Sequence, residues 1–205
     1  AHFVCRSDSE NGTDGKSRNR QQVDYSEDCK KGKEAMALEF VSPEPQHVDE
    51  IGRICFEAFK EVAEAHGFPP DFPTVDLARQ VLGMMVHRDD FYGVVALRDG
   101  RPVGSNFLSL MDPVAGVGPI TIDCSCQGQG IGRALMQDVI DYARRKGIEQ
   151  VRLFQDSFNV ASLSLYASLG FDVKEAAAFM QFPQDVAVTL AEAPDLAGHV
   201  HSDHG

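Results

Sequence analysis

A glycine-rich turn between an apolar strand and an amphipathic helix constrains this chain more than any other feature. The turn is Gln127–Gly132, Gln-Gly-Gln-Gly-Ile-Gly, and the apolar residues 118–123 before it indicate a strand. The helix is predicted by one apolar stripe, formed by Ile131, Leu135, Val139, Ile140 and Ala143. Such a turn presents several unpaired backbone N–H groups in one direction, and the helix dipole adds partial positive charge there. The stretch therefore predicts a phosphate or pyrophosphate site, where larger side chains would block the approach.

Three known glycine-loop patterns can be compared with this turn. A P-loop requires Lys-Ser/Thr after its last glycine, and Gly132 is followed by Arg133-Ala134, which excludes that pattern. A dinucleotide fingerprint requires the third glycine three residues after the second, and the spacing from Gly130 to Gly132 disfavours it. The pattern Gln/Arg-x-x-Gly-x-Gly/Ala fits from Gln127 onward without a gap. The alternative is a glycine-rich turn that binds nothing.

Size and charge narrow the functional classes. A chain of 205 residues with 43% apolar residues suits one domain with tails and a sizeable core. The net charge of −12 argues against nucleic-acid binding through a basic surface and favours cationic acceptors. There is no run of about 18 apolar residues, so we expect no membrane span. The odd number of cysteines, five, and a polar N-terminus without a signal peptide predict a cytoplasmic location.

Periodicity and turn residues predict the order of elements along the chain. Strands are expected at 37–41, 91–97, 103–110, 117–123, 151–154 and 171–182, and helices at 46–66, 75–86, 131–146 and 159–169. Thr74 is the expected cap of the second helix, and tight turns are expected at Arg98–Arg101 and Pro113–Gly116. Hairpins followed by a late βαβ unit predict an α/β (α+β) domain with a mixed sheet. Residues 1–35 are predicted to be a disordered arm, 36–183 the domain and 184–205 a flexible tail.

A second motif follows the glycine turn along the chain. It is Asn159-x-Ala161-x-x-x-x-Tyr166-x-x-x-Gly170-Phe171. The two motifs in this order resemble those of the GNAT superfamily of acyl-CoA-dependent N-acyltransferases, over about residues 37–182, and Gln155–Asn159 is similar to a segment of bacterial members. The resemblance implies a mostly antiparallel mixed sheet flanked by helices. It also implies that acetyl-CoA gives its acetyl group to a primary amine by direct attack through a tetrahedral intermediate, with no metal.

The same resemblance implies roles for particular residues. The residues implied to bind acetyl-CoA are Ile122, Gln127, Gly128, Gln129, Gly130, Ile131, Gly132, Arg133, Asn159 and Ser162. Tyr166 shares a helix face with Asn159 and is implied to donate a proton to the departing CoA sulfur, since an unshifted phenol keeps its proton at neutral pH. Each residue has a structural alternative: Asn159 as a helix cap, Tyr166 as a core residue and Arg133 as a solvated helix residue.

The general base is less clearly marked. Many GNAT members carry a glutamate on the strand before the loop, and Val117–Ile122 contains none. Asp123 is our candidate for this catalytic role, with Asp156 or a water as alternatives. Because the glutamate is missing, we also retain a second class of function, an acyl-CoA-binding regulatory or pseudoenzyme module without turnover. The expected partners are acetyl-CoA and an amine acceptor. The sequence does not decide between a monomer and a homodimer.

Two further groups of residues have features of metal or reactive sites. Cys124-Ser-Cys126 could bind metal, oxidise or carry an acyl group, and we interpret it as ordinary turn residues because no second ligand pair lies nearby in sequence. His199, His201 and His204 have the spacing of a weak metal-ligand cluster in the predicted tail, where we interpret them as incidental.

Overall fold

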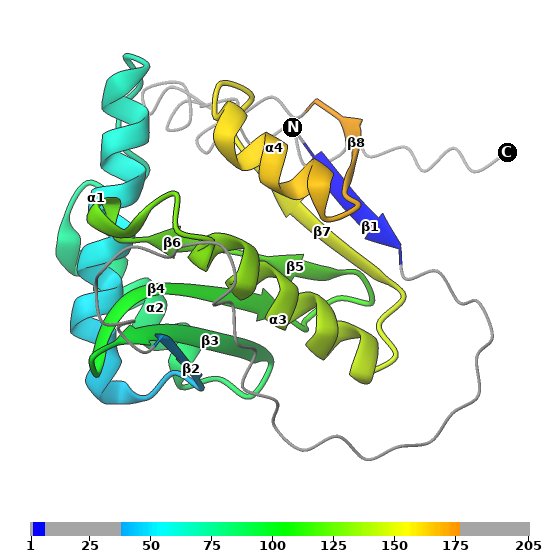
Figure 1. Cartoon of the computed structure of the whole chain (residues 1–205), viewed down its shortest axis with the longest axis horizontal. Helices are drawn as coiled ribbons and strands as arrows, with labels where there is room; N and C mark the ends of the chain where they lie inside the picture. Colours follow the sequence, from blue (N-terminus) through cyan, green and yellow to red (C-terminus); the bar gives the residue numbers. More distant parts are fainter. Residues whose placement is uncertain (1, 7–37, 177–205) are drawn as a thin grey trace, which may run out of the picture. The chain divides into compact units, whose positions relative to one another are not determined.

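The computed structural model describes residues 2–6 and 38–176 (Figure 1). The elements in chain order are β1 (His2–Arg6), β2 (Leu38–Val41), η1 (Pro45–His47), α1 (Val48–Ala65), α2 (Val75–Val86), β3 (Phe91–Arg98), β4 (Arg101–Ser109), β5 (Ala115–Val117), β6 (Thr121–Ile122), η2 (Cys124–Cys126), α3 (Ile131–Arg145), β7 (Gln150–Phe154), α4 (Val160–Ser168) and β8 (Asp172–Glu175). The predicted helices are all present, and their ends lie within a few residues of the predicted ones. Thr74 caps α2, since its hydroxyl accepts a hydrogen bond from the Leu77 N–H at 3.2 Å.

The strands form one mixed, mostly antiparallel sheet, which confirms the predicted fold class. Their order is β2-β3-β4-β5-β7-β1-β8, and β6 pairs with β4 beside this path. Among the strand pairs of the described residues, only β5–β7 is parallel. The β3–β4 hairpin turns at Asp99 and Gly100, whose φ angles of 52° and 74° are left-handed, as the Asp-Gly pair predicted.

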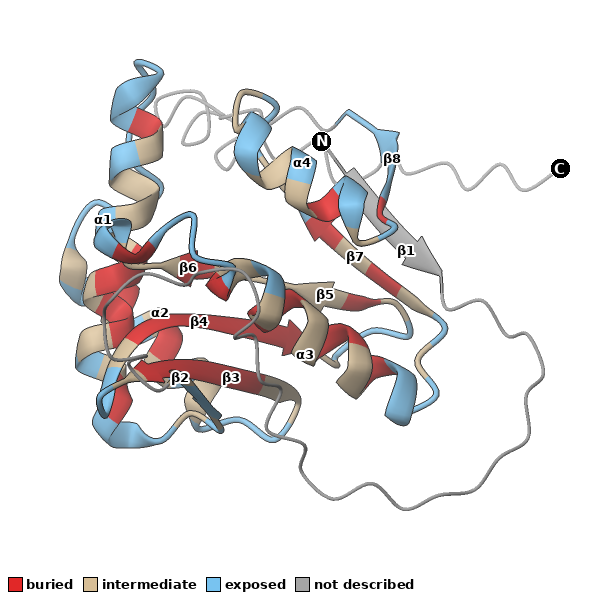
Figure 2. Ribbon diagram, in the orientation of Figure 1, coloured by how far each residue is buried: buried red, intermediate tan, exposed pale blue. Residues whose placement is uncertain are grey.

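Helices cover both faces of the sheet because the side chains of β3 alternate between two cores. Val94 and Ala96 point into the core that α3 covers, whereas Val95 and Leu97 point into the core under α1 and α2. Figure 2 shows the buried residues along β3, β4, β7 and the inward sides of these helices. The predicted stripe of α3 is confirmed, since its five members are buried.

The strand predicted over residues 117–123 is interrupted, and this prediction was wrong in detail. Gly118 and Pro119, joined by a cis peptide bond, separate β5 from β6. Proline has no N–H to donate to a ladder, so a continuous strand through it would lose a hydrogen bond. The turn expected at Pro113–Gly116 was also wrong in part, because Ala115–Val117 form a strand.

The first strand of the sheet differs from the prediction of a disordered arm over residues 1–35. The backbone of His2–Arg6 pairs antiparallel with β7 on one side and with β8 on the other. The sequence pattern missed it because a five-residue strand inside a polar segment carries little periodic signal. The rest of the arm, residues 177–182 of the last predicted strand, the tail at 184–205 and its histidines lie outside the described residues.

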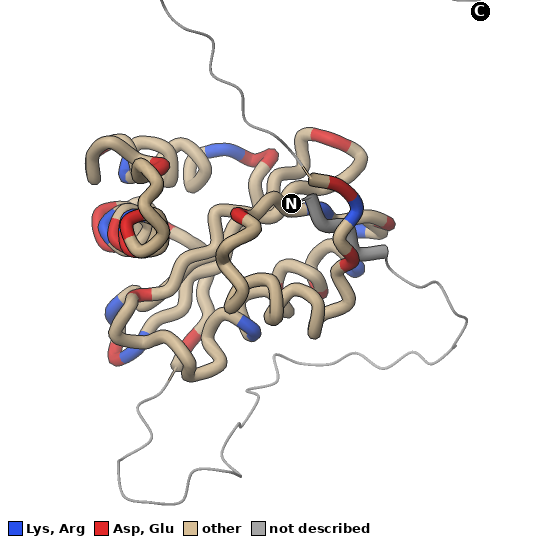
Figure 3. The backbone as a smooth tube through the Cα atoms, turned by 90° about the horizontal axis from the view of Figure 1, so that it is seen from above, with Lys and Arg blue, Asp and Glu red and all other residues tan. Residues whose placement is uncertain are grey.

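Figure 3 marks the charged residues along the backbone, where positive and negative residues are interspersed. No helix in the described ranges is long and apolar enough to cross a membrane. Within the same ranges, no three His, Cys, Asp or Glu side chains are grouped as metal ligands would be.

Candidate active site

The site begins where two neighbouring strands of the sheet diverge. β5 pairs with β7 only through Ala115↔Val151 and Gly116↔Arg152. Beyond Pro119 the chain continues as β6, which stays beside β4 through Ser105↔Thr121. In the described part of the chain, β6 therefore has no strand partner on its β7 side (Figure 1). The facing edges of β6 and β7 are not joined by a ladder there, which leaves a place where an extended ligand can add backbone hydrogen bonds.

The glycine turn follows β6 and opens α3. Gly128 and Gly130 have left-handed φ angles of 72° and 81°, which side chains disfavour. Gly130 is the N-cap of α3, where no side chain caps the helix and no acidic residue lies in the first turn. The first N–H groups of this helix therefore have no side-chain cap, an arrangement that suits an anion.

A third glycine is required by packing instead of by backbone angle. A Cβ atom at Gly132 would lie 3.2 Å from Ile122 Cδ1 and 3.5 Å from Leu165 Cδ2. Gly132 thus lets the first turn of α3 approach both β6 and α4. Arg133 reinforces this approach, because its Nη2 donates to Ser168 Oγ on α4 at 2.6 Å. The two helices that carry the predicted site residues are held together at this point.

The second motif forms the first turns of α4. The Asn159 side chain accepts a hydrogen bond from the Ser162 N–H at 3.2 Å, so the capping role is present. Tyr166 lies further along the same helix with 6% of its surface exposed. Burial raises the pKa of its hydroxyl, and a hydrogen bond from Ser162 opposes that shift. The phenol therefore holds its proton at neutral pH, as a proton donor requires.

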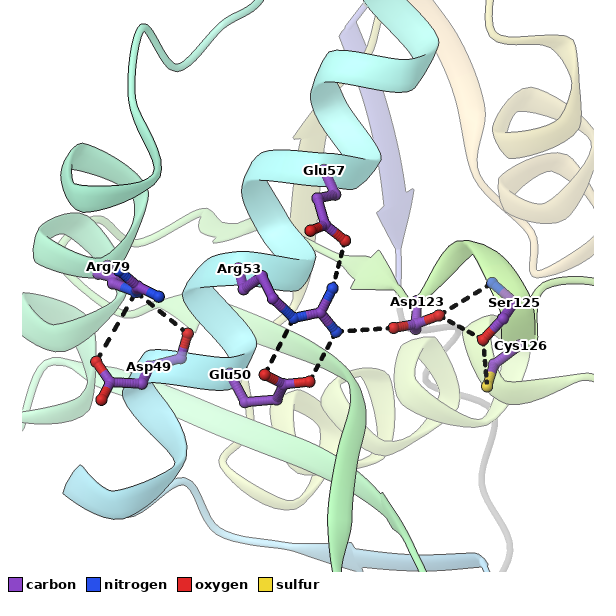
Figure 4. A network of polar contacts seen from close by, with 8 residues as sticks. All are labelled: Asp49, Glu50, Arg53, Glu57, Arg79, Asp123, Ser125 and Cys126. Carbon is purple, nitrogen blue, oxygen red and sulfur yellow. Dashed lines mark hydrogen bonds and ion pairs between the residues drawn. The ribbon is translucent and has the colours of Figure 1, made fainter.

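Asp123, the candidate base, is engaged in a structural network (Figure 4). Its carboxylate accepts from the Ser125 hydroxyl at 2.6 Å and from the Ser125 N–H at 3.0 Å. Arg53 of α1 donates to the other oxygen at 3.0 Å, and also pairs with Glu50 and Glu57. These bonds lower the pKa of Asp123, and the bond from the Ser125 hydroxyl has the largest effect. Asp123 therefore anchors η2 to α1, and its low basicity suits it poorly to proton removal.

Helix α1 contacts the segments that follow both diverging strands. Beside β6, Glu61 is hydrogen-bonded to Cys124, and partial burial followed by this bond raises the pKa of that thiol to about 11. Beside β7, the His66 ring stacks on Phe158 with centroids 4.5 Å apart. Phe68 stacks on the same ring at 4.8 Å. The C-terminal end of α1 and the start of the α1–α2 segment thus meet the β7–α4 segment.

Two carboxylates belong to the same pair of segments. Asp71 lies in the α1–α2 segment and Asp156 in the β7–α4 segment. Partial burial and the charge of Asp156 raise the pKa of Asp71. The field between these segments is therefore negative, and it would favour a positively charged group.

The structure brings together most of the residues predicted as a site. The loop residues, from Ile122 to Arg133, are continuous with the start of α3, and α4 with its three predicted residues packs beside them. Asp123 instead contacts α1 and η2.

Sequence reasoning missed two sets of contacts at this site. Phe158 lies within the segment Gln155–Asn159, yet its ring partners are about 90 residues away in the chain. Arg98, which was predicted only as part of a tight turn, donates from Nη2 to Gln129 Oε1 at 2.7 Å and from Nη1 to Cys126 Sγ at 3.3 Å. No local pattern marks either contact, because each depends on how the elements pack.

Comparison with known proteins places this arrangement in a family. The family described as Acetyltransferase (GNAT) family matches residues 51–171, more than half of the chain. This chain is 38% identical to a mycothiol acetyltransferase of Thermomonospora curvata over 78 residues, which cover 38% of this chain and 26% of that relative. This chain is also 32% identical to an uncharacterized N-acetyltransferase of Methanocaldococcus jannaschii over 105 residues, which cover 48% of this chain and 46% of that relative. The chain thus spans less than half the length of either curated relative.

Solved structures agree at the level of the fold. The PaiA N-acetyltransferase of Thermoplasma acidophilum, in complex with coenzyme A, superimposes with a TM-score of 0.63 at 18% identity, covering 70% of this chain and 94% of that chain. With the family match over most of its described residues, this chain belongs to the acetyltransferase (GNAT) family.

Proposed function

We propose that this protein transfers an acetyl group from acetyl-CoA to a primary amine. The observation that carries the proposal is the uncapped N-terminus of α3 after two left-handed glycines, beside strands that diverge. Phosphate groups fit the first feature, because its N–H groups and the helix dipole favour negative charge. An extended pantetheine arm fits the second, since its amide groups can hydrogen-bond to the backbone between the diverging β6 and β7.

The acetyl transfer proceeds by direct attack in this proposal. The amine nitrogen attacks the thioester carbonyl, and a tetrahedral intermediate forms whose oxyanion is stabilised by backbone N–H groups of the diverging strands. When the intermediate collapses, the C–S bond breaks and Tyr166 gives its proton to the sulfur, while the nitrogen loses its extra proton to solvent, from which the phenolate is protonated again. The raised pKa of this phenol supports the role, because the proton donor must be protonated at working pH.

The acceptor is proposed to enter between the α1–α2 and β7–α4 segments. Asp71 and Asp156 would attract an ammonium group. The pKa of Asp71, raised by partial burial and by the charge of Asp156, makes the Asp71 carboxylate a better proton acceptor than an ordinary aspartate. Asp123 is not assigned this role, because its own pKa is lowered. The aromatic rings of His66, Phe68 and Phe158 would border the amine-bearing group.

The test is CoA release from acetyl-CoA in the presence of a panel of primary amines and peptide N-termini. The chain has five cysteines, so released CoA is best separated by chromatography instead of being titrated with a thiol reagent. Amine-dependent release, with the acetylated amine found by mass spectrometry, is the expected result. Acetyl-CoA binding without release for any amine would favour the regulatory module, which the absence of a strand carboxylate at β6 also suggests.

A further inference from the structure

The strongest unassigned feature of the site is Arg98, at the end of β3. Its guanidinium reaches across from the β3–β4 hairpin and donates to Gln129 of the glycine turn and to Cys126, the last residue of η2 before that turn. Gln129 lies between the two left-handed glycines, and its own amide nitrogen donates to the Ser125 carbonyl at 3.5 Å. Arg98 is therefore held at the anion-binding turn by an element that no sequence motif includes.

The partners of Arg98 distinguish it from most arginines of residues 38–176. Within residues 38–176, a carboxylate pairs with each of Arg53, Arg79, Arg88, Arg144 and Arg152. Arg98 and Arg133 have no such pair among the described residues, and their bonds run to an amide, a thiol and a hydroxyl. Arg101 and Arg145 also have no carboxylate partner among residues 38–176, but neither is hydrogen-bonded to the turn. Arg98 contacts the turn, and Arg133 lies in the first turn of the helix that follows it. These two arginines, which have no carboxylate partner among the described residues, thus lie where an anion is expected.

Charge and bond strength favour a phosphate as the missing partner. The protein carries a net charge of −12, so a polyanion approaches it only where cations oppose the overall field. Hydrogen bonds from a guanidinium to a phosphate are charge-assisted and stronger than those to an amide oxygen or a thiol. A phosphate that replaced Gln129 at Arg98 would therefore gain energy, and the released glutamine is exposed and free to move.

We propose that Arg98 binds a phosphate group of CoA, and that the β3–β4 hairpin is thereby part of the cofactor site. This inference rests on the proposed function in assuming that the anion is CoA. Arg98 and Arg133 supply two guanidinium groups, one from the hairpin and one from the first turn of α3. The pyrophosphate and the 3′-phosphate share the chemistry that Arg98 would recognise, and the experiment separates them.

The experiment measures the Kd of CoA by calorimetry for the unaltered protein and for variants of the same full-length chain. Arg98→Ala is expected to weaken CoA binding about 10- to 100-fold, the range for losing a hydrogen bond to a charged group. Arg98→Lys should restore part of the loss because it keeps the charge. Arg101→Ala is the matched control, since Arg101 faces Arg98 across the same hairpin without contacting the turn, and its Kd should stay within about 2-fold.

Two further arms separate phosphate binding from bracing of the turn. Gln129→Ala removes the present partner of Arg98 and leaves its charge, so Arg98→Ala made in that background tests the guanidinium without the glutamine. The double variant should bind CoA about 10-fold or more weakly than Gln129→Ala alone. Equal losses in Gln129→Ala, Arg98→Ala and the double variant would overturn the proposal, as would a Kd in Arg98→Ala equal to that of Arg101→Ala. Dephospho-CoA decides between the phosphates: if the Arg98→Ala effect disappears with it, the partner is the 3′-phosphate, and if it persists, the pyrophosphate.

Failure of this inference can be told from failure of the proposed function. If the unaltered protein does not bind CoA at all, the proposed function fails together with this assignment. If it binds CoA and Arg98→Ala binds equally well, only the role of Arg98 is wrong. Thermal unfolding of each variant checks that the fold is retained, and Arg98→Lys serves if Arg98→Ala unfolds.

Discussion

Tyr166 shows what a single residue can and cannot reveal in the sequence. Its spacing from Asn159 placed both on one helix face, and the structure puts them on α4 with Ser162 between them. Its burial came from packing against Phe171 and the α3 core, which only the fold supplies. That burial raises the pKa of the hydroxyl, so the environment supports the chemical role that the family resemblance implied.

We therefore expect Tyr166→Phe to lose turnover without losing the cofactor. The variant removes one hydroxyl and almost no volume, so acetyl-CoA should bind with a nearly unchanged Kd. The kcat should fall by about 10²-fold, which is roughly 3 kcal/mol of transition-state stabilisation. Tyr92→Phe is the control, since Tyr92 also packs beside α3 but bonds Asp138 at 2.5 Å. Full activity in Tyr166→Phe would remove this hydroxyl from the mechanism.

The raised pKa of Tyr166 also predicts the pH dependence of the reaction. A proton donor works only while it is protonated, and a raised pKa moves the loss of its proton to above about pH 10. The kcat should consequently show no falling limb between about pH 7 and pH 10. A rate profile with a saturating amine tests this. A decline that begins below about pH 9, in a protein that is still folded, would assign the acid to another group.

At the scale of elements, local signals were read correctly and long-range contacts were not. The stripe of α3, the Thr74 cap and the Asp-Gly turn are each determined by neighbouring residues, so the sequence predicted them. Arg53, Arg98 and Phe158 contact partners 70, 31 and 92 residues away, and no spacing rule marks such pairs. The break in the strand at Pro119 could have been foreseen, because proline cannot continue a ladder.

Asp123 illustrates how such a contact changes an assignment. We expect Asp123→Asn to reduce the free energy of unfolding by about 1 kcal/mol, because its partly exposed pair with Arg53 is discounted by solvent. The lowered pKa means that this stabilisation is present above the unfolded pKa of about 3.9 and is lost as pH falls through the lower folded value. The stability gap to the unaltered protein should thus narrow below about pH 4 in urea titrations.

The same variant tests the catalytic assignment of Asp123. If the carboxylate only anchors η2 to α1, the kcat of Asp123→Asn should stay within about 10-fold of the unaltered value. Asp141→Asn is the control, since Asp141 forms an exposed pair with Arg144 at 3.2 Å on the outer side of α3. A loss of 10²-fold or more in Asp123→Asn alone would restore Asp123 as the base, against the lowered pKa.

A pair of helix glycines gives a test of how α1 and α2 are packed. A Cβ at Gly52 would lie 2.8 Å from the Arg79 Cα atom, which is backbone, whereas a Cβ at Gly83 would meet only Val48 Cγ1 at 3.4 Å. Gly52→Ala should therefore destabilise the protein by about 1–3 kcal/mol by forcing the helices apart. Gly83→Ala should be neutral or stabilising by up to about 1 kcal/mol, because alanine favours the helix. Urea unfolding of both variants measures the contrast, and equal stabilities would contradict the close approach.

At the scale of the whole molecule, the candidate site lies between parts of the sheet that are joined weakly. β5 and β7 share a short ladder. Beyond it, the elements on the β6 side and those on the β7 side are connected through side chains, such as Arg133 to Ser168 and His66 to Phe158. A ligand that lies along β6 and β7 would replace the missing ladder with its own hydrogen bonds. Cofactor binding and stability should then be linked.

Acetyl-CoA at about 100 times its Kd should stabilise the folded state by about 2.7 kcal/mol, which is roughly 5–10 °C in Tm for a chain of this size. Gly130→Glu should abolish this rise, because a negative side chain would occupy the anion site at the start of α3. Gly147→Glu is the matched control: both glycines have left-handed φ angles, 81° and 71°, and an added Cβ meets nothing within 4 Å at either. Both variants should therefore lose similar stability without ligand, while only Gly147→Glu keeps the rise with acetyl-CoA. Thermal melts over a range of acetyl-CoA concentrations measure both effects, and an equal rise in the two variants would place the cofactor elsewhere.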